Sequence, residues 1–148
     1  MLHMIKNRLE CCDKVFYVIF RLLVGFMFFA HGAQKLFGWF GGKVVAIASL
    51  MGVAGIVEVI GGLLIFFGLF TRLAALISAI EIGVAYFKAH FTVSTLAGWM
   101  PLMNKGELAL MYFAAFLVLI MYGAGAWSLE KLFAKKGRIC LVSSRIFH

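Results

Sequence analysis

Residues 21–42 have the sequence RLLVGFMFFAHGAQKLFGWFGG, and this stretch decides how the chain folds. It begins as an apolar helical run and ends in a loop rich in glycine and aromatic residues. Arg21 lies within the apolar run, and His31 and Lys35 lie at its end. An ionisable side chain at the middle of a bilayer costs at least about 2.5 kcal/mol, so Arg21 needs a partner elsewhere in the chain.

The composition is that of an integral membrane protein. The chain has 148 residues, of which 64% are hydrophobic, and its mean hydropathy is +1.04. Soluble domains are only about 45–50% apolar. Membrane spans of about 20 residues with short links would use nearly the whole chain if there were four of them. We therefore expect an all-α membrane protein, a four-transmembrane-helix bundle without a separate soluble domain.

The basic residues gather at the two ends of the chain, which has a net charge of +8. These basic residues are Lys6, Arg8 and Lys14 before the first span, and Lys131, Lys135, Lys136, Arg138 and Arg145 after the last. Such a distribution follows the positive-inside rule and argues against a nucleic-acid partner. It predicts a multi-pass membrane protein with both termini in the cytoplasm, N-in and C-in. Residues 1–14 then form a cytoplasmic or interfacial segment, residues 15–131 the membrane domain, and residues 132–148 a basic cytoplasmic tail.

The three cysteines, Cys11, Cys12 and Cys140, all lie in the basic ends. A reducing cytoplasm argues against a structural disulfide there. A redox or metal role for the adjacent pair stays open, and the sequence assigns no role to any of the three. Because Arg21 interrupts the first apolar run, we expect the first span to be retained and not cleaved as a signal peptide.

Hydrophobic periodicity and glycine-rich breaks predict spans at residues 15–37, 44–70, 72–91 and 107–122. Residues 92–106 are expected to form an outer loop or lid, and Thr71 is expected to cap the third span. Each of the first three spans has a face of polar and small residues that can point inward. The three faces are Arg21, Gly25, Phe28, His31, Gly32 and Lys35; Met51, Ala54, Gly55, Glu58, Gly61, Gly62 and Ile65; and Ala74, Ser78, Glu81, Ala85 and Lys88.

The charges inside the spans predict an ion pair. Counting about 1.5 Å per residue from the inner end of each span brings Arg21 within reach of Glu58 and Glu81. We expect Arg21 to pair with one of them, which leaves the other carboxyl without a cation. A carboxyl of this kind in an apolar medium favours its protonated form, which suits a proton relay or a hydrogen bond to a quinone.

A second group of ionisable residues lies near the outer ends of three spans. Together with the buried charges they are candidates for a ligand or proton site in a polar cavity that opens outward, with Arg21 near its floor. The candidates are Arg21, His31, Lys35, Glu58, Glu81, Lys88, His90 and Glu107. The alternative is a charge network that only fixes the helix register. We predict no metal site, because no third ligand has helical spacing to His31 or His90.

At these residues the chain resembles the DoxX family of small four-helix membrane proteins. The pattern R-x3-G-x5-HG-x2-KLFG covers residues 21–38, and E-x2-GG-x5-G-x2-TR covers residues 58–72. Glu81, His90, NKGE at residues 104–107 and GAGAWSLE at residues 123–130 complete the resemblance, which extends over residues 15–131. The family more often has glycine in place of Lys105 and proline in place of Ala124.

The resemblance implies a protein of a bacterial-type cytoplasmic (inner) membrane. Relatives in the family occur as the membrane subunit of a thiosulfate:quinone oxidoreductase or are linked to thiol and oxidative-stress systems. The chain has neither a CxxCH haem motif nor the glycine fingerprint of a flavin site, so electrons would come from a partner. We expect the membrane subunit of a redox system with a quinone or proton site, and whether the chain is itself an enzyme stays open.

Two other functions are left open: a small-solute carrier or channel, and a membrane anchor for soluble redox enzymes. The expected partners are the lipid bilayer, a soluble redox or sulfur-transfer enzyme, and a second copy of the chain packed through its glycine faces. No cofactor is expected within the chain itself, and quinone is the one small molecule that we expect it to bind.

Overall fold

The computed structural model describes residues 2–91 and 95–135, and every regular element in them is helical. The long helices are α1 (Leu2–Phe37), α2 (Leu50–Phe67), α3 (Thr71–Ala89) and α6 (Glu107–Tyr122). The short helices are η1 (Trp39–Gly41), α4 (Leu96–Trp99) and α5 (Pro101–Asn104), and residues 129–135 are also helical. The all-α prediction is confirmed for this part of the chain. Cys140 and the rest of the basic tail from residue 136 lie outside the described residues, as do the side chains of residues 2–11.

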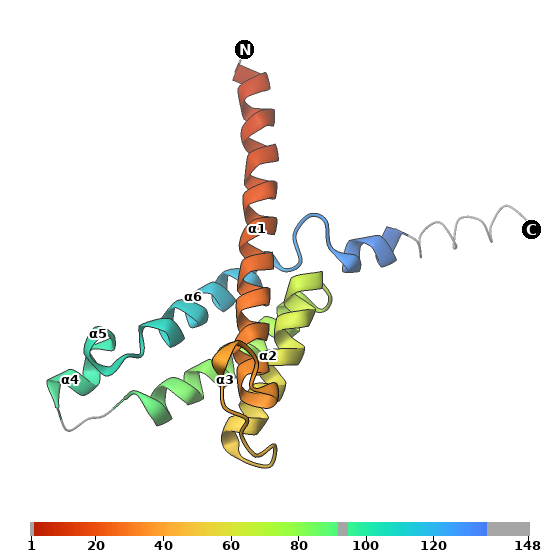
Figure 1. Cartoon of the computed structure of the whole chain (residues 1–148). Coiled ribbons are helices and arrows are strands. Elements are labelled where there is room, and N and C mark those ends of the chain that lie inside the picture. Colours follow the sequence, from red (N-terminus) through yellow and green to blue (C-terminus); the bar gives the residue numbers. More distant parts are fainter. Residues whose placement is uncertain (1, 92–94, 136–148) are drawn as a thin grey trace, which may run out of the picture.

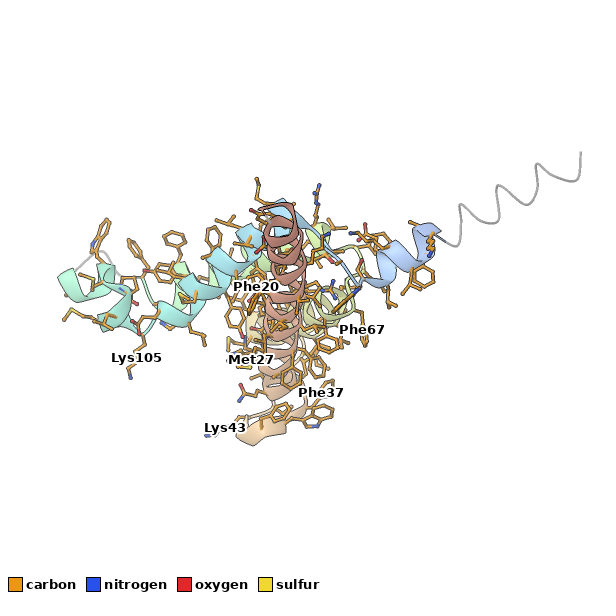
Figure 2. All side chains as sticks on the ribbon, turned by 90° about the horizontal axis from the view of Figure 1, so that it is seen from above. Phe20, Met27, Phe37, Lys43, Phe67 and Lys105 are labelled. Carbon is orange, nitrogen blue, oxygen red and sulfur yellow. The ribbon has the colours of Figure 1, made fainter. Side chains whose placement is uncertain are left out.

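The four long helices form two hairpins that meet at one end and diverge toward the other (Figure 1). α1 packs against α2, and α3 packs against α6. Seen from above, α3 and α6 still extend away from the α1/α2 hairpin, so the two hairpins cross steeply (Figure 2). The architecture is therefore a pair of splayed hairpins, and the angle between them is a feature that the hydropathy pattern does not predict.

Glycines bring the backbones of α1 and α2 into direct contact. A Cβ atom at Gly25 would lie 2.6 Å from the backbone nitrogen of Phe66, and one at Gly62 would lie 2.5 Å from the backbone nitrogen of Phe29. A Cβ atom at Gly32 would likewise lie 2.6 Å from a backbone nitrogen of α2. Only glycine permits so close an approach. These glycines are buried between α1 and α2 and offer no surface to a second copy of the chain. Self-association of the protein stays a prediction.

Local signals explain where the helices begin. The hydroxyl of Ser49 accepts a hydrogen bond from the backbone nitrogen of Gly52 at 3.1 Å, and α2 therefore begins at Leu50 instead of residue 44. The prediction that Thr71 caps α3 is wrong, because the N-cap is Phe70 and Thr71 is the first helical residue. α1 has no break between residues 14 and 15, so its first turns continue the span and project beyond the other helices (Figure 1).

Within the described residues, two helices are long and apolar enough to cross a membrane: Cys12–Phe37 and Leu50–Phe67. α6 is apolar but has only 16 residues, and α3 carries Arg72, Glu81 and Lys88. The count of four spans and the orientation of the termini therefore stay predictions.

The side chains divide into a small core and a large apolar surface. Phe28, Ile65 and Phe116 are fully buried where the two hairpins meet. Met27 and Phe67 are each 49% exposed, and they are labelled among the many apolar side chains that cover the outside of the helices (Figure 2). An apolar exterior of this extent suits a lipid environment.

Candidate functional site

Arg21 holds the two hairpins together at the end where they meet. Its side chain is buried, and its guanidinium donates hydrogen bonds to the backbone carbonyls of Ala124, Ala126 and Trp127. These carbonyls follow the C-terminal end of α6, where the helix dipole places partial negative charge. Beside them, the hydroxyl of Tyr17 donates to the carbonyl of Gly123 at 2.6 Å. A cation inside an apolar segment is thus neutralised by backbone oxygens.

The prediction that Arg21 pairs with Glu58 or Glu81 is wrong, and so is its placement near the floor of the outward cavity. The glycine contacts fix the register of α1 on α2 and bring Arg21 against Gly68, where a Cβ atom would lie 2.9 Å from a guanidinium nitrogen. Glu58 lies ten residues, or about 15 Å of helix, away from Gly68. Counting residues from the span ends could not reveal this offset.

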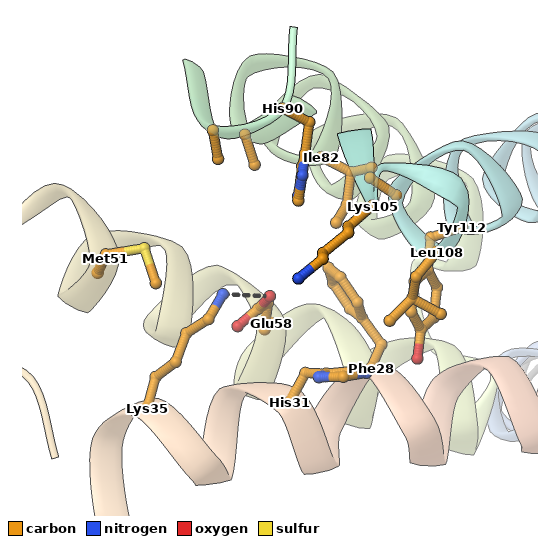
Figure 3. Close-up of a pocket in the computed structure, with 13 residues that line it drawn as sticks. Phe28, His31, Lys35, Met51, Glu58, Ile82, His90, Lys105, Leu108 and Tyr112 are labelled. Carbon is orange, nitrogen blue, oxygen red and sulfur yellow. Dashed lines mark hydrogen bonds and ion pairs between the residues drawn. The ribbon is translucent and has the colours of Figure 1, made fainter. Parts of the chain in front are cut away.

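A cavity of about 310 Å³ lies between the diverging hairpins (Figure 3). All four long helices and the turn after α5 contribute to its lining. The lining residues are Phe28, His31, Lys35, Met51, Glu58, Ile82, Ala85, Ala89, His90, Lys105, Leu108, Ala109 and Tyr112. Cavities of this size hold small organic ligands, and mostly apolar walls with a few polar groups are typical of such sites.

An ion pair stands in the wall of the cavity. Lys35 Nζ lies 2.7 Å from Glu58 Oε1, and the side chains of Lys35 and Glu58 are 23% and 4% exposed. The second carboxylate oxygen, Glu58 Oε2, is buried and has no hydrogen-bond partner among the described residues. Glu81 on α3 is half-buried, also has an unpartnered Oε2, and lies within electrostatic range of Glu58 and Lys35. The cavity wall therefore combines a fixed cation with a buried carboxylate oxygen that has no partner among the described residues.

Aromatic rings complete the walls on the α1 and α6 sides. Tyr112 stands 5.5 Å from the ring of Phe28 and 5.7 Å from the imidazole of His31, measured between ring centroids. Both contacts hold the rings at steep angles to each other. This arrangement fixes the orientation of His31 and leaves aromatic faces and edges toward the cavity.

A short hydrogen-bond network around Asn104 holds the loop between α3 and α6, which borders the cavity on the side of His90 and Lys105. The amide of Asn104 donates to the carbonyl of Gly98 at 2.9 Å, and its oxygen accepts from the backbone nitrogen of Gly106 at 2.8 Å. Its backbone carbonyl lies 2.9 Å from Nδ1 of His90. Lys105, between Asn104 and Gly106, has φ 61, in the left-handed region. That conformation costs a non-glycine residue about 1–2 kcal/mol, which gives a physical reason for glycine at this place in the family pattern.

The structure brings together some of the predicted site residues and separates others. His31, Lys35, Glu58 and His90 line the cavity, and Glu81 lies close behind them. Arg21 is at the opposite end, and neither Lys88 nor Glu107 lines the cavity, because both are exposed to solvent or lipid. The other nine lining residues had not been recognised as site residues, among them Phe28, Lys105 and Tyr112. The spacing of Phe28, His31 and Lys35 on one helix face could have identified the first, and the unusual lysine in NKGE the second. No signal identifies Tyr112.

Of the three cysteines, only Cys12 has a described thiol, and it is free and exposed. It lies on α1 sixteen residues before Phe28, which is about 24 Å of helix away from the first lining residue of the cavity. Cys11 and Cys140 lie outside the described side chains. The cysteines therefore contribute nothing to the cavity within the part of the chain that the structure describes.

Comparison with known proteins assigns the chain to a family. A Haemophilus influenzae protein of uncharacterised function is 38% identical over 138 residues, which are 88% of this chain and 99% of that protein. CatD of Bacillus subtilis, which bears the description of a candidate oxidoreductase, is 30% identical over 102 residues, 63% of this chain and 76% of CatD. No solved structure matches the chain at a significant level. The sequence model of the DoxX family matches residues 16–91, and the chain therefore belongs to the DoxX family.

Proposed function

We propose that this DoxX-family membrane protein is the membrane subunit of a redox system and that its cavity binds the headgroup of a quinone. The observation that carries the proposal is the Lys35–Glu58 pair, which faces a cavity of about 310 Å³ with one carboxylate oxygen unpartnered. Tyr112, with Ile82 and Leu108 beside it, offers an apolar wall against which a quinone ring can pack. The similarity to CatD, described as a candidate oxidoreductase, supports the same assignment.

The residues of the cavity fit the two needs of quinone chemistry, hydrogen bonds to the ring oxygens and protons. Reduction of a quinone to a hydroquinone takes up two electrons and two protons. Lys35 and His31 are placed to donate hydrogen bonds to a ring oxygen, and Glu58 is placed to exchange a proton through its free oxygen. The electrons come from a soluble redox or sulfur-transfer partner, since the sequence has no haem or flavin motif.

In this proposal all four long helices cross a bacterial-type inner membrane, with both termini in the cytoplasm. The basic residues of the two chain ends support the orientation. α6, about 24 Å long, spans with local thinning of the bilayer. The joined end then faces the cytoplasm, and the cavity opens toward the outer surface. A hydrophobic quinone reaches the cavity from the bilayer through the gap between the hairpins.

Quinone binding in lipid nanodiscs tests the proposal. Titration calorimetry with short-chain benzoquinone and naphthoquinone analogues should give binding to the wild type. Glu58→Gln and Lys35→Met should each weaken it at least about tenfold, the equivalent of one charge-assisted hydrogen bond. Glu107→Gln is the matched control, because Glu107 is exposed and does not line the cavity. Equal affinity in the Glu58 and Glu107 variants would refute the site.

Flux measurements separate this function from solute transport. Proteoliposomes that contain only this protein should release no trapped small solute, because Arg21 and the loop after α6 close the joined end. Solute release that stops in Glu58→Gln, in a protein that binds no quinone, would support a carrier or channel instead.

A further inference from the structure

Lys105 combines an unfavourable backbone conformation with a position at the mouth of the cavity. Its φ of 61 lies in the left-handed region, where glycine is the residue without steric strain. Its side chain lines the cavity, and it is exposed like the neighbouring lining residues Met51 and Leu108. Strain of this kind at a site is an observation that asks for a functional reason.

The ammonium group of Lys105 supplies a positive charge that the cavity does not neutralise. Within the described residues, Glu58 is the only carboxylate of the lining, and it is paired with Lys35 at 2.7 Å. The Lys105 ammonium has no hydrogen-bond or ion-pair partner in the same part of the chain, and Figure 3 shows it turned toward the Lys35–Glu58 pair. His90 points into the same space from α3, with its Nδ1 held by the carbonyl of Asn104. Glu81 does not line the cavity.

The rest of the lining favours a flat apolar body. Phe28, Ile82 and Tyr112 are buried side chains of three different helices, and Leu108 faces them from the start of α6 (Figure 3). An aromatic ring of a ligand can meet the Tyr112 ring in edge or offset-stacked geometry, with Ile82 and Leu108 beside it. The volume of about 310 Å³ is at the lower end for organic ligands, which limits the bound part to one or two rings.

From these features we propose that the cavity selects small aromatic anions, meaning one or two rings that carry a single ionised oxygen group, either a carboxylate or a phenolate. The rings pack against the wall formed by Ile82, Leu108 and Tyr112, and the ionised oxygen binds the Lys105 ammonium with His90 beside it. Because Lys105 lies at the exposed mouth, its charge also attracts the anion toward the opening. The proposal rests on the proposed function in using the same cavity, and it adds the charge of the ligand.

A comparison of matched ligands tests the selectivity in nanodiscs. 1-Naphthoate and 1-naphthamide have nearly the same shape and differ in charge, and a nitrophenol above its ionisation pH provides the phenolate. The wild type should bind 1-naphthoate or the phenolate at least about tenfold more tightly than 1-naphthamide, as expected for one charge-assisted contact. Which of the two anions binds identifies the oxygen group. Lys105→Gly should abolish the preference, and Lys105→Arg should retain most of it.

The variants are chosen so that a folding defect cannot imitate the result. Glycine adopts the backbone conformation of residue 105 without strain, so Lys105→Gly should unfold at the same or a higher temperature than the wild type. Lys88→Ala is the control. Lys88 is an exposed lysine at the C-terminal end of α3, two residues before His90, and it does not line the cavity. Alanine replaces it because glycine would disturb the helix. Lys88→Ala should keep the full preference for the anion.

Two results would overturn the proposal: equal affinity for 1-naphthoate, phenolate and 1-naphthamide in the wild type, or a preference that survives Lys105→Gly. The same protein is titrated with a neutral quinone. Anion selectivity without quinone binding would refute the proposed function and leave this inference standing. Quinone binding without anion selectivity would do the reverse.

Discussion

Arg21 and Lys35 are cations on the same face of α1, and the structure neutralises them in different ways. Arg21 is buried and donates to three backbone carbonyls after α6, whereas Lys35 pairs with the carboxylate of Glu58. Backbone carbonyls cannot give up or take up a proton at ordinary pH, but a carboxylate can. This difference gives Arg21 a structural role and makes the pair in the cavity the place where the proposed proton exchange can occur.

Removal of the Arg21 guanidinium should destabilise the protein strongly. Arg21→Met leaves three carbonyls near the end of α6 without donors, which should lower the free energy of unfolding by about 3 kcal/mol or more. Arg72→Met is the control, because Arg72 is exposed and donates one bond, to the carbonyl of Met121 at 3.3 Å. It should cost less than about 1 kcal/mol. Denaturant unfolding in mixed micelles measures both, and similar losses in the two variants would contradict the role of Arg21.

The sequence predicted the inward face of α1 but not the partners of its charges. Arg21, Phe28 and Gly32 are buried as the helical periodicity requires. Which residue of α2 lies opposite each of them depends on the contacts of the glycines, and periodicity along one helix carries no information about that register. The Lys35–Glu58 pair was therefore not predicted, although both residues were candidates.

The α1/α2 hairpin owes its close packing to glycine, and the α3/α6 hairpin does not. Gly25 and Gly62 lie where any side chain would collide with the backbone of the other helix, whereas Gly83 on α3 has no atom within 4 Å of a Cβ position. The two kinds of glycine provide a direct test of the close packing of α1 on α2. A substitution by alanine should destabilise the protein at Gly62 but not at Gly83.

Gly62→Ala should force α1 and α2 apart. Its added methyl group would lie 2.5 Å from the backbone nitrogen of Phe29. Overpacking of this kind should cost about 1–3 kcal/mol of unfolding free energy. Gly83→Ala should instead be neutral or stabilising by up to about 1 kcal/mol, since alanine is the better helix former. Thermal unfolding of both variants in the same detergent measures the difference. A Gly62→Ala variant as stable as Gly83→Ala would show that the helices do not approach as closely as described.

Taken together, the molecule has one closed end and one open end. Arg21, Tyr17 and the loop of residues 123–128 tie the closed end, and the cavity with Lys105 lies toward the open end (Figures 1 and 3). If the closed end faces the cytoplasm, as proposed, the cavity opens toward the outer side of the membrane. The orientation in the membrane is thus part of the functional proposal.

Cysteine labelling of intact cells should reveal that orientation. In a chain whose native cysteines are replaced by serine, Lys43→Cys should react with a membrane-impermeant maleimide before lysis, because Lys43 is exposed in the connection between α1 and α2. Lys135→Cys, exposed beyond the closed end, should react only after lysis. The opposite pattern would show that the orientation is inverted. Labelling of both sites before lysis would place Lys43 and Lys135 on the same, outer side of the membrane and contradict the proposed topology.

Much of the fold could be predicted from the sequence, but its assembly could not. The bounds of α6 agree with the predicted span at residues 107–122, and α3 agrees to within two residues at each end. The steep crossing of the hairpins was not predicted, because hydrophobic periodicity identifies the buried face of a helix and leaves its angle to the next hairpin undetermined. The cavity that results from this crossing was anticipated only as a polar space between spans, and its mouth residue Lys105 was not among the candidates.

The most direct test is photoaffinity labelling with an azido-quinone in native membranes, followed by mass spectrometry of the modified peptides. The account predicts label on cavity residues from more than one helix, such as Met51 and Leu108, and loss of that label when unmodified quinone is added. The label should also be lost in Glu58→Gln. Label spread over lipid-facing residues such as Phe67 and Met121, unaffected by competing quinone or by the Glu58 substitution, would contradict it.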